Sequence, residues 1–111
     1  MVTITIKRSE NGLIKSFTLS GHANFRKHGQ DIVCAGASAV SFGTINAIAE
    51  LTKTKPNIKQ GGKGGFLRCE IPEDVEQATQ EKMQLLLEGM IISLQTIEKD
   101  YGKHIKIVTN A

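Results

Sequence analysis

The feature that most constrains the fold is an uncharged stretch from Ile32 to Ala49. Asp31 directly precedes it and can cap a helix that begins at Ile32. A helix without charged residues is predicted to be buried on most sides. The stretch is barely long enough to span a membrane and contains polar side chains and two glycines, so we interpret it as a core helix. Its many small residues predict close packing against a sheet, a neighbouring helix or a second subunit.

The length of the chain limits what can surround that helix. With 111 residues, of which 40% are hydrophobic and 23% charged, we expect a single domain over residues 1–111 with one modest core. This composition excludes collagen-like and disulfide-scaffold proteins. Aromatic residues make up only 5%, which is poor for a base-stacking platform. The net charge of +3 is a small excess, so we favour a solvated basic surface over a dedicated nucleic-acid face.

Alternating patterns at the start of the chain predict a pair of strands. Apolar and polar residues alternate over residues 2–7, which is typical of a half-buried strand. The Asn11-Gly12 pair predicts a tight turn into a returning strand over residues 13–20. Ile14 interrupts the alternation there and predicts either a bulge or an apolar patch.

After the uncharged helix, the sequence predicts a linker, a strand, a second helix and a last strand. Residues 52–65 form the linker, with a glycine-rich tip, and residues 66–71 form a strand that Pro72 ends. Acidic side chains suit the start of a helix, so Glu73 and Asp74 are expected to open the second helix, which ends near residues 99–102. Its apolar stripe is Met83, Leu86, Met90, Leu94 and Ile97, with Leu85 and Ile92 off it. The final strand contains Ile105, Ile107 and Val108.

These elements predict an α+β fold, with a second strand allowed inside the linker. We expect a two-layer sandwich in which two main helices cover a mostly antiparallel sheet. Met1–Arg8 resembles a strand and not the apolar core of a secretory signal. With only two cysteines and no such start, the protein is expected to be cytoplasmic, with reduced thiols and no association with a membrane.

The residues that could carry chemistry cluster between positions 21 and 38. His22 follows a strand directly, and Cys34 lies in the first turn of the helix that Asp31 caps. The unpaired amides and the dipole at a helix N-terminus favour an anion, so this position suits a thiolate nucleophile. A nearby histidine can pair with that thiolate, and the same amides can receive the oxyanion of a tetrahedral intermediate.

Each of these residues also has a purely structural interpretation. A cysteine in an apolar helix is more often a small core residue, as we expect for Cys69. Asp31 can orient His22 as the third member of a triad does, or it can simply cap the helix. Ser38 lies one turn after Cys34 and can bind substrate, or its hydroxyl can bond back to a helix carbonyl.

The sequence is also compatible with a different base, a metal site and an RNA-binding surface. His28 is a rival base, and together with His22 and Cys34 it would supply two nitrogens and a sulfur for zinc. The wide spacing disfavours that site, so neither a metal nor an organic cofactor is expected. The lysines of residues 52–65 also permit a non-catalytic ribosome- or RNA-binding module, although a solvated loop is the more ordinary explanation.

The motifs GHA at residues 21–23 and GQDIVCAGAS at residues 29–38 resemble the Prp family, the bacterial ribosomal-processing cysteine proteases. The uncharged helix and the late SLQTIEKDY stretch at residues 93–101 extend the resemblance over essentially the whole chain.

That resemblance implies a cysteine endopeptidase that removes a short N-terminal extension from one large-subunit ribosomal protein, in support of ribosome assembly. It assigns Cys34 as the nucleophile and His22 as the base of a Cys-His dyad. Gly21, Asp31 and Ser38 match further motif positions with supporting or substrate-binding roles. It also implies an α/β sandwich that forms homodimers and has a peptide substrate, with no direct nucleic acid required.

The resulting hypothesis is a two-step peptide cleavage. An extended peptide enters beside the loop of residues 23–30, which closes over it and brings His22 near Cys34. The thiolate attacks the scissile carbonyl, and His22 passes a proton to the leaving amine and then activates water.

Overall fold

A computed structural model describes residues 1–21, 31–61 and 65–110 of the chain. Within these ranges it contains five strands and two helices. In chain order they are β1 (Val2–Arg8), β2 (Ile14–Ser20), α1 (Ile32–Thr52), β3 (Asn57–Gln60), β4 (Phe66–Glu70), α2 (Gln77–Tyr101) and β5 (Ile105–Asn110).

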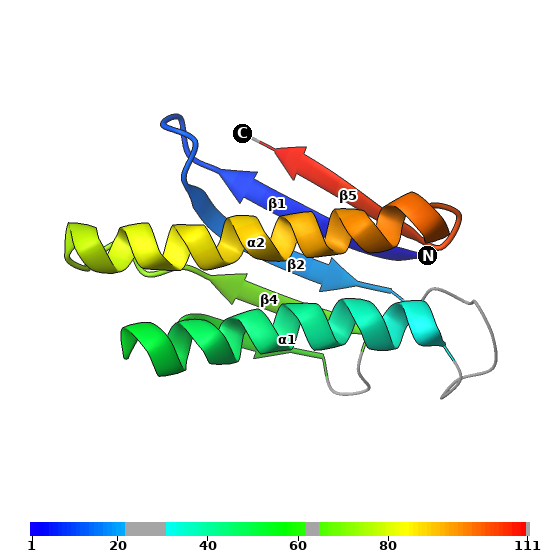
Figure 1. Cartoon of the computed structure of the whole chain (residues 1–111), viewed down its shortest axis with the longest axis horizontal. Helices are drawn as coiled ribbons and strands as arrows, with labels where there is room; N and C mark the ends of the chain where they lie inside the picture. The colour runs from blue at the N-terminus through cyan, green and yellow to red at the C-terminus, as the bar shows by residue number, and fades with distance from the viewer. Residues whose placement is uncertain (22–30, 62–64, 111) are drawn as a thin grey trace.

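The strands form one sheet in the order β3-β4-β2-β1-β5. Every neighbouring pair is antiparallel except β1 and β5, which are parallel. Both helices lie on the same face of the sheet, side by side, so the molecule has two layers (Figure 1). The predicted α+β sandwich with a mostly antiparallel sheet is therefore confirmed.

The core lies between the sheet and the helices. Val2, Ile4 and Ile6 of β1 are completely buried, as the alternating pattern predicts. The predicted bulge is also present: the β1–β2 register shifts between Lys7 and Arg8, so that Arg8 pairs with Ile14. The extra residue lets Ile14 point into the core together with Phe17.

The opposite side of the sheet carries mostly polar side chains, and we call it the open face. It is defined by the residues that alternate with the core positions in the strand registers. They are Thr3, Thr5, Lys7, Ser16, Thr18, Ser20, Asn57, Lys59, Phe66, Arg68, Glu70, Lys106, Val108 and Asn110.

The prediction that the uncharged helix is buried on most sides is wrong for a single chain. The buried residues of α1 form one stripe, namely Val33, Ala37, Ser41, Ile45 and Ile48. The helix is long and apolar enough, by length and composition alone, to cross a membrane, with a mean hydropathy of 1.6. In the fold it packs against α2, where Gly36 faces Ile97, and its other side is left uncovered by the described residues. An uncharged sequence indicates that a helix is shielded from water, but it does not indicate whether the same chain or another molecule shields it.

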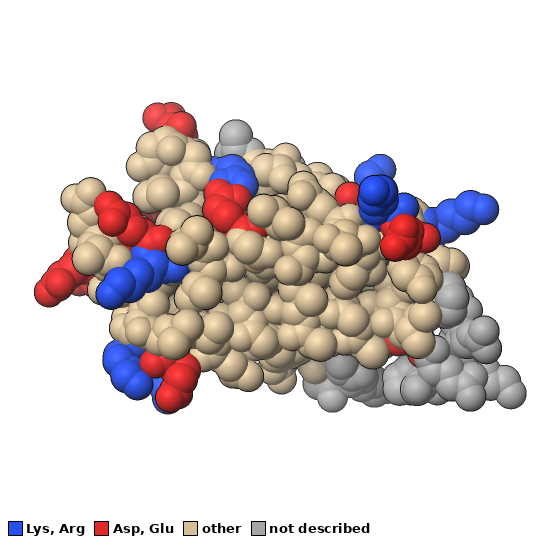
Figure 2. Space-filling model, in the orientation of Figure 1, with Lys and Arg blue, Asp and Glu red and all other residues tan. Residues whose placement is uncertain are grey.

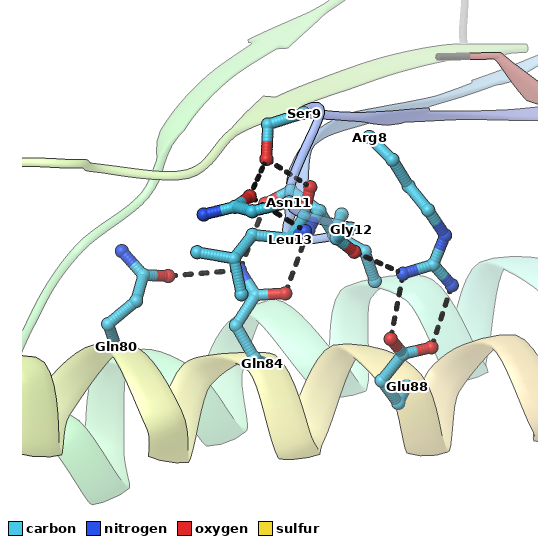
Figure 3. Close-up of polar contacts among 9 residues, drawn as sticks. Arg8, Ser9, Asn11, Gly12, Leu13, Gln80, Gln84 and Glu88 are labelled. Carbon is cyan, nitrogen blue, oxygen red and sulfur yellow. Dashed lines mark hydrogen bonds and ion pairs between the residues drawn. The ribbon is translucent and has the colours of Figure 1, made fainter.

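Polar contacts fix the β1–β2 hairpin to α2 (Figure 3). The buried amide of Gln84 pairs with the backbone of Ile14, accepting from its N–H at 2.8 Å and donating to its carbonyl at 3.0 Å. Beside it, both terminal nitrogens of Arg8 donate to the Glu88 carboxylate at 2.8 Å. These hydrogen bonds hold the pKa of Glu88 below its usual value. The hairpin end of the sheet is thereby attached to the first half of α2.

The second strand allowed inside the linker is present, and one sequence-based boundary needs correction. The predicted linker contains the short strand β3, whose four residues are all exposed at the edge of the sheet. The second helix begins at Gln77, later than the predicted start, because the Val75 amide bonds to the Glu73 carbonyl in a preceding turn. Of the residues placed off the stripe, Leu85 and Ile92 are indeed exposed.

Candidate active site

The N-terminus of α1 is built by the Asp31 cap that the sequence predicts. Asp31 has an extended backbone, and its carboxylate accepts a hydrogen bond from the Cys34 amide at 2.9 Å. Its carbonyl accepts from the Ala35 amide at 3.0 Å. An aspartate in this role satisfies an amide that has no carbonyl partner within the helix. Capping by Asp31 is thus confirmed.

Cys34 is held in the first turn by that cap. It is half-buried, packs against the edge of the core, and is not part of a disulfide. In an α-helix the first amides point out of the N-terminus, and the Asp31 carboxylate takes the one that belongs to Cys34 itself. The amides of Ile32 and Val33 remain as candidate donors to an anion beside the thiol.

Ser38 lies one helical turn after Cys34, so the two side chains share a side of α1. It is half-buried, which leaves its hydroxyl within reach of solvent or of a bound molecule. The back-bonding that was its structural alternative occurs elsewhere in α1, where the Thr44 hydroxyl donates to the Val40 carbonyl at 2.7 Å.

Gly21 ends β2 in a position that only glycine fits. Its φ is +87°, and a Cβ built on it would lie 2.4 Å from the Met1 carbonyl oxygen. Its amide donates to the Gly65 carbonyl at 2.7 Å. Gly21, directly after β2, is therefore held by the residues that precede β1 and β4, at the point from which the chain continues to His22.

Several elements end at the same side of the molecule as Cys34 (Figure 1). The start of α1 lies beside the end of α2, as the contact between Gly36 and Ile97 requires. His104, directly before β5, is half-buried, and its carbonyl accepts from the Val2 amide at 2.8 Å. The sequence does not show this convergence, because it depends on the packing of α1 against α2 and on the parallel pairing of β1 with β5.

The two histidines of the sequence-based hypotheses, His22 and His28, lie outside the described residues, as does the loop of residues 23–30. The pairing of His22 with Cys34 and the zinc alternative therefore remain predictions. Within residues 1–21, 31–61 and 65–110, no group of three histidine, cysteine or acidic side chains is arranged to hold a metal ion.

Cys69 contrasts with Cys34 in every respect. It lies on β4, is completely buried and belongs to the core. Burial, together with the neighbouring Glu70 carboxylate, raises the pKa of the Cys69 thiol to about 12. A thiol that stays protonated and has no access to solvent is inert, as the sequence predicts.

A groove of about 870 Å³ lies at the opposite end of the molecule from Cys34, between the β1–β2 turn and the start of α2. Residues that line it include Asn11, Pro72 and Gln77, and Cys34 is not among them. The chemistry of Cys34 therefore has no connection with this groove.

Comparison with known proteins identifies close relatives along the whole chain. Residues 1–106 match the family model Peptidase_Prp, described as cysteine protease Prp. A relative from Bacillus subtilis, named ribosomal processing cysteine protease Prp, is 47% identical over 110 residues, which cover 99% of this chain and 98% of the relative. A relative of the same name from Staphylococcus aureus is 38% identical over 107 residues, covering 96% and 97% of the two chains.

Solved structures of the protease Prp from S. aureus have the same fold as this chain. The S. aureus protease Prp in complex with a covalently linked product peptide superimposes with a TM-score of 0.90 at 37% identity, covering 99% of this chain and 100% of that one. The same protease with a substrate peptide gives a TM-score of 0.83 at 36% identity, with the same coverage.

Proposed function

Because the chain belongs to the family of the cysteine protease Prp, we propose that it removes a short N-terminal extension from a large-subunit ribosomal protein and so supports ribosome assembly. Its relatives are ribosomal processing cysteine proteases, and one of them has been crystallised with substrate and product peptides. The proposal assigns residues 1–111 to one protease domain, acting in the cytoplasm without a cofactor or a membrane.

The observation that carries the proposal is the position of Cys34 in the capped first turn of α1. Of the two cysteines, Cys34 alone has solvent access, a helix N-terminus and neighbouring amides. The dipole and amides of that turn stabilise negative charge, first on the thiolate and then on the oxyanion. A covalently linked product peptide in a relative with the same fold is also consistent with covalent catalysis.

The reaction follows from these assignments in two steps. The Cys34 thiolate attacks the scissile carbonyl, and the carbonyl electrons move onto the oxygen, which the amides of Ile32 and Val33 stabilise. His22, protonated, gives its proton to the leaving amine as the C–N bond breaks. His22 then takes a proton from water, which attacks the thioester and releases the new carboxylate together with the thiol.

The remaining motif residues support this arrangement. Gly21 fixes the place from which the chain leaves β2 immediately before His22. Asp31 shapes the N-terminus of α1 around Cys34. Ser38, on the same side of α1, is proposed to contact the bound peptide.

We also propose a homodimer that buries the outer face of the helical layer. Apart from Glu88, which pairs with Arg8, the exposed side chains in the middle of α1 and α2 carry no charge, and Figure 2 shows a broad uncharged surface over the helices. Members of this outer helical face are Ala35, Ala39, Gly43, Leu85, Gly89, Ile92 and Thr96. Small side chains flanked by Leu85, which is 74% exposed, and Ile92, which is 64% exposed, suit close approach of a second copy.

The activity is tested by incubating the candidate ribosomal protein with purified enzyme and measuring its mass. Wild type should shorten the substrate at one N-terminal site, whereas Cys34→Ala and His22→Ala should leave it intact. Cys69→Ala and His28→Ala are the matched controls and should retain cleavage. Cleavage by Cys34→Ala would overturn the assigned nucleophile, and loss of cleavage in His28→Ala alone would overturn the assigned base.

A further inference from the structure

The open face of the sheet, opposite the helices, has no role in the proposed chemistry. The strand registers arrange its residues in rows that cross the sheet. One row begins with Lys59 on β3 and Arg68 on β4, and another ends with Lys106 on β5. Among the described residues, no buried apolar side chain lies on this face.

Charge is distributed unevenly between the two sides of the molecule. The open face carries four cations, Lys7, Lys59, Arg68 and Lys106, and one carboxylate, Glu70. Glu70 forms an ion pair with Arg68 at 3.5 Å and offsets one of the four charges. On the opposite side, over the helices, most of the surface is uncharged apart from the Arg8–Glu88 ion pair and the charges near the ends (Figure 2). Among the described residues, the open face therefore has an excess of cations over carboxylates.

The spacing of the cations selects the kind of ligand. Lys59 and Lys106 lie on the two edge strands, four strand spacings apart, which is about 19 Å. A single phosphate or carboxylate cannot contact both, but an extended polyanion can. Threonine and serine hydroxyls fill the positions between them and are ordinary donors to phosphate oxygens.

We propose that the open face binds single-stranded RNA through its phosphate backbone. Phe66 lies on this face and is 40% exposed, which offers one aromatic ring for an unpaired base. With a single aromatic residue, the contacts are mainly to phosphates, so binding is independent of sequence. The choice of RNA among polyanions rests on the proposed function, because a ribosomal substrate meets RNA during assembly.

The test measures binding of the full chain to a fluorescently labelled, single-stranded RNA of mixed sequence, by anisotropy at several salt concentrations. The variant Lys7→Gln/Lys59→Gln/Lys106→Gln removes three charges from the open face. Its matched control, Lys82→Gln/Lys99→Gln/Lys103→Gln, removes three exposed charges elsewhere. Vesicles containing phosphatidylglycerol serve as the alternative polyanion, and cleavage of the ribosomal protein is measured in parallel without RNA.

We expect the open-face variant to bind RNA at least tenfold more weakly and to lower the salt slope by about 2, since each lost phosphate contact contributes about 0.7. The control should stay within about twofold of wild type, and both variants should cleave normally. The inference is overturned if wild type does not bind, if the control weakens binding equally, or if vesicles bind more tightly than RNA. If wild type binds RNA as expected but does not cleave the ribosomal protein, the result counts against the proposed function and not against RNA binding.

Discussion

At the scale of single residues, the two cysteines show how position decides chemistry. Cys34 lies half-buried in the first turn of α1, directly after the Asp31 cap and beside the amides that end the helix. Cys69 lies in the core beside Glu70, and both its burial and that carboxylate oppose ionisation. The sequence distinguishes them because Cys34 follows a capping residue, whereas Cys69 alternates with the apolar residues of a strand.

The pKa of Cys69 predicts a loss of stability at high pH. Its pKa is raised in the folded state to about 12 from an ordinary value of 9.0, so the unfolded state loses this proton first. The corresponding stability is fully present below pH 9 and is lost as the pH rises towards 12. We expect the slope of unfolding free energy against pH to be shallower in Cys69→Ala than in wild type, by up to about 1.4 kcal/mol per pH unit. Urea unfolding at pH 8, 9.5 and 10.5 measures it, and equal slopes would contradict the assignment.

At the scale of elements, local sequence signals predicted the first residue of one helix correctly but not that of the other. The start of α1 was predictable because Asp31 is a strong cap directly before an uncharged run. The start of α2 was not, since Glu73 and Asp74 suit a first helical turn equally well but precede it here. The contact between Gly21 and Met1 is not readable from the sequence, because it depends on the register between β1 and β2.

Gly21 and Gly12 form a matched pair for testing that contact. Both have a φ of +87°, so an alanine at either position incurs the left-handed penalty of about 1 kcal/mol. A Cβ at Gly12 meets nothing within 4 Å, whereas one at Gly21 meets the Met1 carbonyl at 2.4 Å. We expect Gly21→Ala to lower the free energy of unfolding by at least about 1 kcal/mol more than Gly12→Ala, and to reduce cleavage as well. Equal losses in chemical denaturation would show that the Met1 contact relaxes freely.

Two substitutions of Asp31 distinguish the effect of its hydrogen bond from the effect of its negative charge. Asp31→Ala removes the acceptor for the Cys34 amide and should destabilise the protein by about 1 kcal/mol. Asp31→Asn keeps an acceptor of similar geometry and should restore most of that stability. If Asp31 acts only as a cap, Asp31→Asn also cleaves normally. A stable but inactive Asp31→Asn would instead show that the carboxylate orients His22.

At the scale of the whole molecule, the uncharged sequence of α1 predicted burial that one chain does not supply. Its buried stripe faces the core, and its other side lies open together with the outer side of α2. Pattern alone cannot tell a helix covered by its own chain from one covered by a second copy, because both bury the same residue types. We therefore propose that a second copy of the chain covers the remaining apolar surface of the two helices.

Introducing charged side chains into the outer helical face should dissociate a homodimer that forms through it. Leu85→Glu/Ile92→Glu places two carboxylates on it, and in a two-fold interface each substitution occurs twice, so like charges meet their own copies. We expect wild type to be dimeric in light scattering at micromolar concentration and this variant to be monomeric, with an unchanged circular dichroism spectrum. Ile58→Glu, at an exposed apolar residue on the edge strand β3, is the matched control and should remain dimeric. A monomeric wild type would exclude the dimer, and a dimeric Leu85→Glu/Ile92→Glu would place its interface on another surface.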